Sequence, residues 1–192
     1  MEFYGKTPEK KMKTYIAMLR GINVSGQKKI LMKDLSSLFI SLGFTNVKTY
    51  IQSGNVLFQS KNKNVKELIS SIEKKIVEVF GFEAAVFIRT KEELKSVLGS
   101  NPFPKKDPSR IYVSFLNESK KNPDLTEIDS AKAKGEELIV RDREIYFFSP
   151  KGYGATKLSN NFLEKKLNVA ATTRNWKTIV ALCALSDEPT TK

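Results

Sequence analysis

One order of elements occurs twice along the chain, and this repeat limits the fold more than any other feature of the sequence. Alternating or continuous apolar runs predict strands, and apolar residues spaced three and four apart predict helices. Both halves then read strand, helix, strand, strand, helix, strand, helix. In the first half the predicted elements cover residues 13–20, 32–42, 46–52, 55–59, 65–80, 84–89 and 91–99. In the second half they cover residues 110–116, 123–134, 136–140, 144–148, 158–167, 168–172 and 174–185.

Turn-forming residues separate these elements. Ser53-Gly54 stands between two strand-like runs and predicts a tight hairpin. Gly43 and Gly81 directly follow two amphipathic stretches, where a glycine commonly ends a helix. Residues 101–109, NPFPKKDPS, contain three prolines and few apolar side chains, so they predict the connection between the two halves.

The repeated order predicts an α+β protein made of two ferredoxin-like βαββαβ(α) subdomains with antiparallel sheets. We expect the first subdomain at residues 12–100 and the second at residues 110–186, joined by the linker 101–109. Residues 1–11 are expected to be a flexible extension or a tag remnant, and residues 187–192 a flexible tail. An open sheet face in such a unit could serve as a binding platform.

The sequence lacks the residues that several kinds of chemistry require. It has no histidine, and Cys183 is its single cysteine. One chain therefore cannot build a structural zinc site or a Ser-His or Cys-His dyad, so no metal site is expected and no cofactor is indicated. A lone thiol suits a reducing compartment, and no apolar run approaches the roughly 20 residues that cross a bilayer. We expect a cytoplasmic protein without a membrane partner.

The charge of the chain is strongly positive and unevenly distributed. The formal net charge is +12 at pH 7. Residues 20–66 have a local balance of +7 and residues 149–181 a balance of +5, so these two segments together account for the whole net charge. Such basic segments favour anionic partners. The alternative is a compositional bias towards lysine and asparagine without any binding surface.

The first basic segment contains two candidate binding loops. Arg20, Gly21 and Asn23 leave the end of a predicted strand, where glycines let the backbone approach an anion closely. Gln52 and Asn55 flank the hairpin turn, where side-chain amides could bind a polar ligand. The alternative for both loops is that they serve only turn geometry.

The second basic segment contains two more candidates. Thr172-Thr173 precede the last predicted helix, which places Arg174 and Asn175 in its first turn. A cation is unfavourable at the positive end of a helix, so Arg174 there would indicate a nearby anion or carboxylate, unless it stacks on an aromatic ring. Residues 152–157, GYGATK, combine glycines, a hydroxyl and Lys157 before a predicted helix, as in a phosphate-binding loop, although the spacing is not that of a Walker A motif.

Three stretches of the sequence resemble the signature of a known family: LRGINVSGQKKILMKDL at 19–35, TYIQSGNVLF at 49–58 and TTRNWKTIVAL at 172–182. The family is a bacterial domain of unknown function numbered sixteen ninety-seven, and the resemblance extends from about Met12 to Leu185. It implies a compact α+β body of two related subdomains and no established activity. Family members often carry a serine before the lysine of the glycine loop, where this chain has Thr156. The motifs coincide with the candidate loops, which favours one shared site formed by Arg20, Asn23, Gln52, Asn55, Lys157, Arg174 and Asn175.

Three classes of function remain open at this point. The first is a binding protein for an anionic ligand, either nucleic acid or another polyanion, through basic loops. The second is an enzyme acting on a small phosphorylated or carboxylated metabolite, which would need a lysine, a carboxylate or a bound metal ion for proton transfer. The third is a protein-interaction module.

Overall fold

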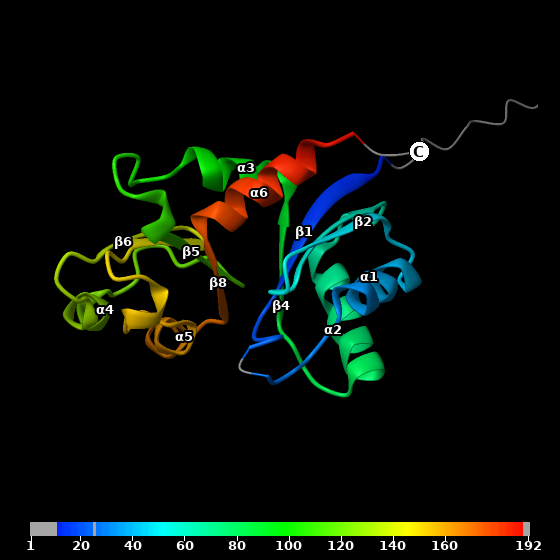
Figure 1. Ribbon diagram of the computed structural model, residues 1–192, viewed down its shortest axis with the longest axis horizontal. Coiled ribbons are helices and arrows are strands. Elements are labelled where there is room, and N and C mark those ends of the chain that lie inside the picture. Colours follow the sequence, from blue (N-terminus) through cyan, green and yellow to red (C-terminus); the bar gives the residue numbers. More distant parts are fainter. Residues whose placement is uncertain (1–10, 25, 190–192) are drawn as a thin grey trace, which may run out of the picture.

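The computed structural model describes residues 11–24 and 26–189, and Figure 1 shows two lobes joined side by side. The extension predicted at residues 1–11 lies outside the described residues except for Lys11. The first lobe contains β1 (Lys13–Leu19), α1 (Met32–Ser41), β2 (Thr45–Tyr50), β3 (Asn55–Ser60), α2 (Val65–Phe80), β4 (Val86–Thr90) and α3 (Lys91–Gly99). The second lobe contains β5 (Ile111–Leu116), α4 (Thr126–Ala131), β6 (Glu137–Arg141), β7 (Glu144–Phe148), α5 (Asn160–Leu167), β8 (Ala171–Asn175) and α6 (Trp176–Asp187).

Each lobe is a ferredoxin-like subdomain with one antiparallel sheet. The strand orders are β2-β3-β1-β4 and β6-β7-β5-β8, so the first strand of each half lies between its third and fourth strands. All six strand pairings are antiparallel. The fold class predicted from the repeated element order is therefore confirmed.

Local capping explains why several predicted helix ends agree with the structure. The side chain of Asn64 accepts hydrogen bonds at the start of α2, and Gly81 ends that helix with a φ of 74°. Thr90 and Glu93 form a reciprocal capping box at the start of α3. These contacts join residues only a few positions apart, so their pattern is visible in the sequence.

The prediction for the last strand and the last helix was wrong in its boundaries. Strand β8 covers Ala171–Asn175 rather than residues 168–172, and α6 begins at Trp176. Thr172 and Thr173 are thus strand residues, and the N-cap is Asn175, whose side chain accepts from Thr178 N–H. The β-branched threonines suit a strand, and pairing with β5 extends that strand as far as Asn175.

The helix α4 is shorter than the predicted range 123–134. It covers Thr126–Ala131, because the Asp124 side chain caps the turn before it and Lys132 already has an extended backbone. The predicted linker at 101–109 contains a buried side chain, that of Phe103, and Pro108–Arg110 form a short 3-10 turn directly before β5. The connection is therefore packed against the protein.

The apolar residues form three cores, and the middle one belongs to both subdomains. One core lies between the first sheet and α1 with α2, and another between the second sheet and α5 with α4. The shared core joins the remaining faces of both sheets with α3 and α6, which pack against each other along the top of Figure 1. Trp176 and Cys183 belong to this shared core. The sheet face that could have served as an open binding platform is therefore covered.

The two halves also repeat individual contacts. Tyr15 stacks on Phe58 with ring centroids 5.5 Å apart, and Tyr112 stacks on Phe147 at 5.3 Å. In each pair the tyrosine comes from the first strand of its half and the phenylalanine from the third. The two halves are therefore similar in the packing of these side chains as well as in the order of their elements. Within the described residues, no helix is long and apolar enough to cross a membrane.

Candidate functional site

Arg174 lies at the boundary between the subdomains, and its guanidinium is fully engaged. It is 8% exposed on strand β8, from which it reaches into the first subdomain. Its Nε donates to Asn55 Oδ1 at 2.5 Å, and its Nη2 donates to Leu19 O at 2.8 Å and Ser53 O at 3.0 Å. Its Nη1 donates to the Thr172 hydroxyl and to a neighbouring carbonyl, both at 2.9 Å. These five bonds use all five N–H groups of the guanidinium.

Burial strongly affects this arginine. Desolvation lowers the pKa of Arg174 to about 10, while Tyr153 opposes the shift. The side chain still carries its proton at neutral pH, and the neutral oxygens around it bind that charge. Because the acceptors belong to the protein, the guanidinium is not free for an external anion. Neutral oxygens of the protein bind Arg174 in place of the expected anion, carboxylate or aromatic ring.

Arg89 makes the reciprocal contact from the first subdomain. It is 2% exposed on strand β4. Its Nε donates to Glu144 Oε1 at 2.8 Å, and its Nη2 donates to Leu116 O at 2.9 Å and Arg143 O at 3.1 Å. Each subdomain thus extends one buried arginine into the other, and we call Arg89, Arg174 and their acceptors the arginine clasp.

The strand registers give the two arginines equivalent positions. Each lies on the fourth strand of its half, one residue before the N-cap of the following helix. Each binds the last carbonyl of the partner's first strand and the first residue of the partner's third strand. The corresponding register pairs are Ile16 with Arg89, Val113 with Arg174, Met18 with Asn55, and Phe115 with Glu144.

Sequence reasoning missed Arg89. Its signal is present, because each half has an arginine followed by a helix-capping residue, Arg89-Thr90 and Arg174-Asn175. The misplaced start of the last helix hid the correspondence. An alignment of the halves on their last strands would have shown it.

Arg20 is also bound within the protein. Its Nε donates to Ala171 O at 2.8 Å, and its Nη2 donates to Asn161 Oδ1 at 2.7 Å and forms an ion pair with Glu164. Since Leu19 precedes Arg20 and accepts from Arg174, the two arginines converge as the sequence motifs suggested. They converge to join the subdomains, and Gly21 beside them is exposed with a φ of 71°.

Asn23 organises the loop that follows. Its side-chain amide binds both the N–H and the carbonyl of Ile30 and donates to Gln52 O at 2.9 Å. The Gln52 side chain is exposed, so its backbone rather than its amide makes this contact. Gly54 completes the turn with a φ of 72°, and a Cβ there would lie 2.7 Å from Ile22 Cδ1. The hairpin turn therefore requires glycine.

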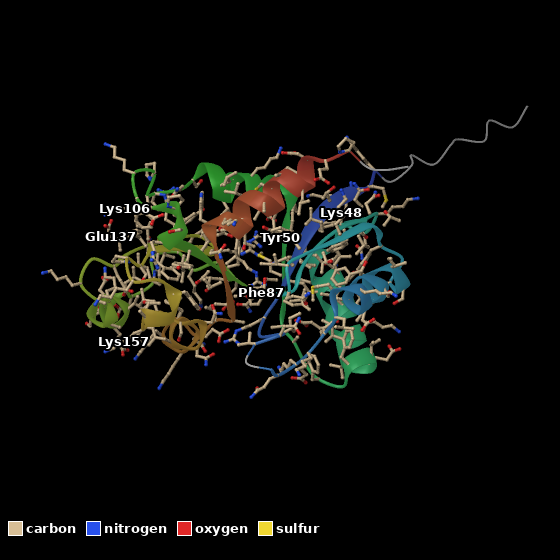
Figure 2. All side chains as sticks on the ribbon, viewed as in Figure 1. Lys48, Tyr50, Phe87, Lys106, Glu137 and Lys157 are labelled. Carbon is tan, nitrogen blue, oxygen red and sulfur yellow. The ribbon has the colours of Figure 1, made fainter. Side chains whose placement is uncertain are left out.

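The glycine loop of the second half reaches the surroundings of Arg174 through Tyr153, whose hydroxyl accepts from Asn160 N–H at 3.3 Å. Gly152 has a φ of 88° and lies against Arg110, and Tyr153–Ala155 form a 3-10 turn rather than leading directly into a helix. Helix α5 starts later, where Ser159 Oγ accepts from Phe162 N–H. Lys157 is exposed on the second lobe, away from Phe87 at the centre of the molecule (Figure 2). The loop therefore does not lead directly into a helix as the predicted phosphate cradle would require.

Asn175, another predicted site residue, is the N-cap of α6.

A buried tyrosine at the subdomain boundary predicts that the stability of the fold decreases at alkaline pH. Tyr146 donates to Val97 O at 3.1 Å, and desolvation, followed by Glu144, raises its pKa to about 12. A tyrosine with a raised pKa stabilises the fold below its unfolded pKa of 10, and this contribution is lost as pH rises from 10 through about 12. We expect the urea midpoint of the wild type to fall across that window more steeply than that of Tyr146→Phe. Equal slopes would contradict this assignment.

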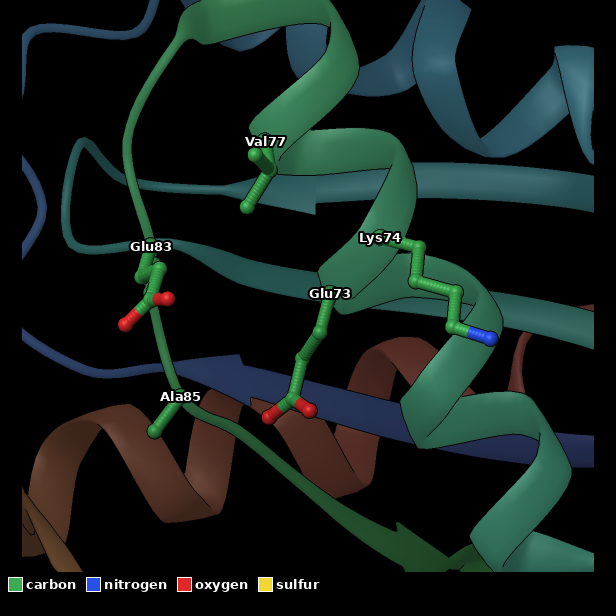
Figure 3. A pocket seen from close by; sticks show the side chains of 6 residues that line it. Glu73, Lys74, Val77, Glu83 and Ala85 are labelled. Atoms are coloured by element: carbon green, nitrogen blue, oxygen red, sulfur yellow. The ribbon is translucent and has the colours of Figure 1, made fainter.

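A surface hollow of about 540 Å³ lies between α2 and the segment that enters β4 (Figure 3). It is lined by Glu73, Lys74, Val77, Glu83, Ala84 and Ala85. Glu73 contributes to the fold by accepting from Val86 N–H at 2.9 Å. With two carboxylates and one ammonium group, this hollow does not suit an anion.

A second surface feature is strongly basic. A groove of about 290 Å³ is lined by Lys11, Met12, Lys13, Thr14, Lys63, Lys91 and Glu92. Four of its seven residues are lysines and one is acidic. We call this feature the basic groove. None of its residues was singled out from the sequence, because the lysines come from three separate segments.

In the part of the chain that the structure describes, the buried polar side chains have partners within the protein. No group of three His, Cys, Asp or Glu residues is placed there to hold a metal ion. No buried side-chain nitrogen or oxygen among these residues lacks a hydrogen-bond partner. The polar groups at the subdomain boundary therefore bind one another.

Fold and boundary together define a class: a duplicated ferredoxin-like protein whose halves share a core and exchange buried arginines. The family model described as "Protein of unknown function (DUF1697)" matches residues 12–146, and the chain belongs to this family. It is also similar to the solved structure of the conserved bacterial protein SP0830 from Streptococcus pneumoniae, with 25% identity and a TM-score of 0.69. That alignment covers 91% of this chain and 99% of the other. No curated protein matches the chain.

Proposed function

We propose that this protein binds the phosphate backbone of a nucleic acid, and that the basic groove is the binding surface. The observation that carries the proposal is the meeting of four lysines and one glutamate in the lining of one groove. Lys91 pairs with Asp187 Oδ1 at 2.7 Å, so the groove offers chiefly Lys11, Lys13 and Lys63 to a partner. Ammonium groups that neutralise phosphates release counterions, which drives binding irrespective of nucleotide sequence.

The topology of the first subdomain explains why these lysines meet. Strands β3 and β4 both run antiparallel to β1. Both therefore finish at the end of the sheet where β1 begins, which we call this edge. Helices α2 and α3 follow those strands and therefore start at the same edge. Lys11 and Lys13 come from the start of β1, Lys63 precedes α2, and Lys91 starts α3.

The electrostatics of this edge favour a negative partner. The positive ends of two helix macrodipoles add to the lysine charges. The pKa of Glu92 is lowered, first by its own backbone N–H and then by the Thr90 hydroxyl and the ammonium groups of Lys13 and Lys91. The two ammonium groups contribute to this lowering, so a negative group at this end of the sheet meets positive charge.

The structure also changes how the first basic segment is interpreted. Lys28, Lys29 and Lys33 follow the end of β1, whereas Lys61 and Lys63 follow the end of β3, which is the opposite edge of the sheet. The basic residues of the segment 20–66 are thus divided between two surfaces of the protein. The second of these continues into the lysine-lined groove.

Charge reversal tests this proposal. We expect the full chain to bind a single-stranded oligonucleotide of about 20 nucleotides at roughly 50 mM salt. The double variant Lys13→Glu/Lys63→Glu should bind at least about tenfold more weakly, and the slope of log K against log salt should decrease by about 2. Fluorescence anisotropy over a salt series measures both quantities.

The matched control is Lys105→Glu/Lys134→Glu, which makes the same change in net charge at two exposed lysines of other segments. Its affinity should stay within about twofold of the wild type. Equal losses in the two double variants would show attraction by net charge alone and would overturn the proposal. Undetectable binding of the wild type to DNA and RNA would also overturn it.

The alternative of an enzyme for a small phosphorylated or carboxylated metabolite has no comparable observation in its favour. It depended on Arg20, Lys157 and Arg174 acting together. Both guanidiniums are bound within the protein, and the exposed lysine lies elsewhere on the surface.

A further inference from the structure

Three exposed aliphatic side chains gather around the loop that Asn23 organises. Val24, Leu31 and Ile51 are 58%, 69% and 50% exposed. Asn23 binds Ile30 on one side and Gln52 on the other, so each of the three aliphatic residues is a chain neighbour of a group in this hydrogen-bonded cluster. Their backbone positions are therefore held close to one another, although they come from two segments of the chain.

Ile51 occupies a backbone conformation that suits it poorly. Its φ is 49°, in the left-handed region, where a β-branched side chain is a rare exception. Glycine or asparagine would adopt this conformation at lower cost. The isoleucine therefore destabilises the turn, and its exposed side chain recovers little of that cost by burial.

Leu31 is also unfavourable for local stability. It is the N-cap residue of α1 and makes no side-chain hydrogen bond to the helix. Serine, threonine, aspartate or asparagine would satisfy one of the free N–H groups there. Two neighbouring positions thus carry exposed aliphatic residues where polar residues would stabilise the fold. Such departures from local rules are expected where a surface has a function.

The surroundings of these aliphatic residues are basic. Lys28, Lys29 and Lys33 belong to the same loop and the start of α1, where Asp34 is acidic. The Lys28 ammonium group donates to Glu83 O at 2.6 Å, and Lys29 is exposed. Residues 20–33 and 45–55 contain no aspartate or glutamate. We call the surface formed by Val24, Lys28, Lys29, Leu31 and Ile51 the Asn23 surface.

We propose that the Asn23 surface docks an acidic segment of a partner protein that also carries aliphatic or aromatic side chains. The lysines complement acidic side chains, and the three aliphatic side chains need apolar groups to bury. A nucleic acid backbone would satisfy the lysines and leave Leu31 and Ile51 exposed to water. The composition therefore favours a protein, and this surface is separate from the basic groove.

Stability and binding should change in opposite directions in one variant. Leu31→Ser/Ile51→Asn supplies an N-cap and a residue that tolerates the left-handed conformation. We expect its thermal midpoint to rise by about 4 °C or more. A fall in the midpoint would contradict the argument that the wild-type residues are retained against stability.

Peptide selection tests the partner class. A displayed library of random peptides of about 12 residues is selected on the full wild-type chain, and the enriched peptides are measured by fluorescence polarisation. We expect peptides that combine Asp or Glu with aliphatic or aromatic residues. Their affinity should fall at least about tenfold in Leu31→Ser/Ile51→Asn and stay within about twofold in the control Val79→Ser/Ile139→Asn. The control removes exposed aliphatic side chains elsewhere on the surface.

Several results would overturn the proposal. Enriched peptides that bind both double variants equally well would place them on another surface. A tenfold loss of oligonucleotide affinity in Leu31→Ser/Ile51→Asn without acidic peptide binders would assign the surface to nucleic acid. Self-association that disappears in the same variant, measured by sedimentation, would assign it to a second copy of the chain.

Discussion

Arg174→Met is expected to lower the free energy of unfolding by about 4 kcal/mol, since each buried polar group left without a partner costs roughly 1–3 kcal/mol. The substitution leaves Leu19 O, Ser53 O and Asn55 Oδ1 without their donor at a boundary that excludes water. Methionine fills much of the arginine volume, so the effect comes from lost hydrogen bonds more than from a cavity. Urea unfolding at neutral pH measures the change.

Two further variants serve as controls for Arg174→Met. Arg20→Met lies at the same boundary, but its side chain is 25% exposed, so water can replace its contacts and the cost should be about 1 kcal/mol. Arg174→Lys keeps the charge and loses the planar fork, so it should fall between wild type and Arg174→Met. An Arg174→Met variant as stable as Arg20→Met would contradict the clasp as a main determinant of stability.

Arg89→Met is the second large effect that we expect, at about 3–5 kcal/mol, because removal of one member leaves a buried charge without its partner. Glu144, at 14% exposure, would lose its ion pair, and the carbonyls of Leu116 and Arg143 would lose a donor. Burial lowers the pKa of Arg89, and Glu144 opposes that shift, which indicates that the pair is coupled.

The other half of the clasp supplies the control for this variant. Glu144→Gln places a neutral amide opposite Arg89, which resembles the pairing of Asn55 with Arg174. We expect it to cost about 1–2 kcal/mol, less than Arg89→Met, because a neutral oxygen still accepts the bond. A Glu144→Gln variant at least as unstable as Arg89→Met would show that the charge, rather than the hydrogen-bond geometry, dominates. Both are measured by urea unfolding.

Most of the element order could be predicted from the sequence because it depends on local patterns. Helix α2 covers residues 65–80 as predicted, since its apolar spacing, its cap at Asn64 and its stop at Gly81 all lie within one short segment. Strand β8 could not be placed in this way. The residues Thr172 to Asn175 fit either a helix start or a strand, and pairing with β5 decides between them.

Several residues expected to form one site lie together in the structure. Arg20, Asn55 and Arg174 meet at the subdomain boundary, and Asn23 donates to Gln52 O, one residue before the Ser53 carbonyl that Arg174 binds. Lys157 is exposed on the second lobe. The role of the residues that meet at the boundary differs from the predicted anion site because their partners are oxygens of the protein itself, including the Glu164 carboxylate that pairs with Arg20. A sequence shows which residues can donate hydrogen bonds, but not which acceptors lie within reach.

The sequence by itself determined the repeated order of elements, the glycine stops of two helices, the tight turn at Ser53-Gly54 and the absence of histidine chemistry. Each of these depends on neighbouring residues or on composition. Only the tertiary structure decided that Arg89 and Arg174 are equivalent, that the sheet faces close over a shared core, and that four lysines from separate segments line one groove. These features depend on how two antiparallel sheets face each other, which joins residues distant along the chain.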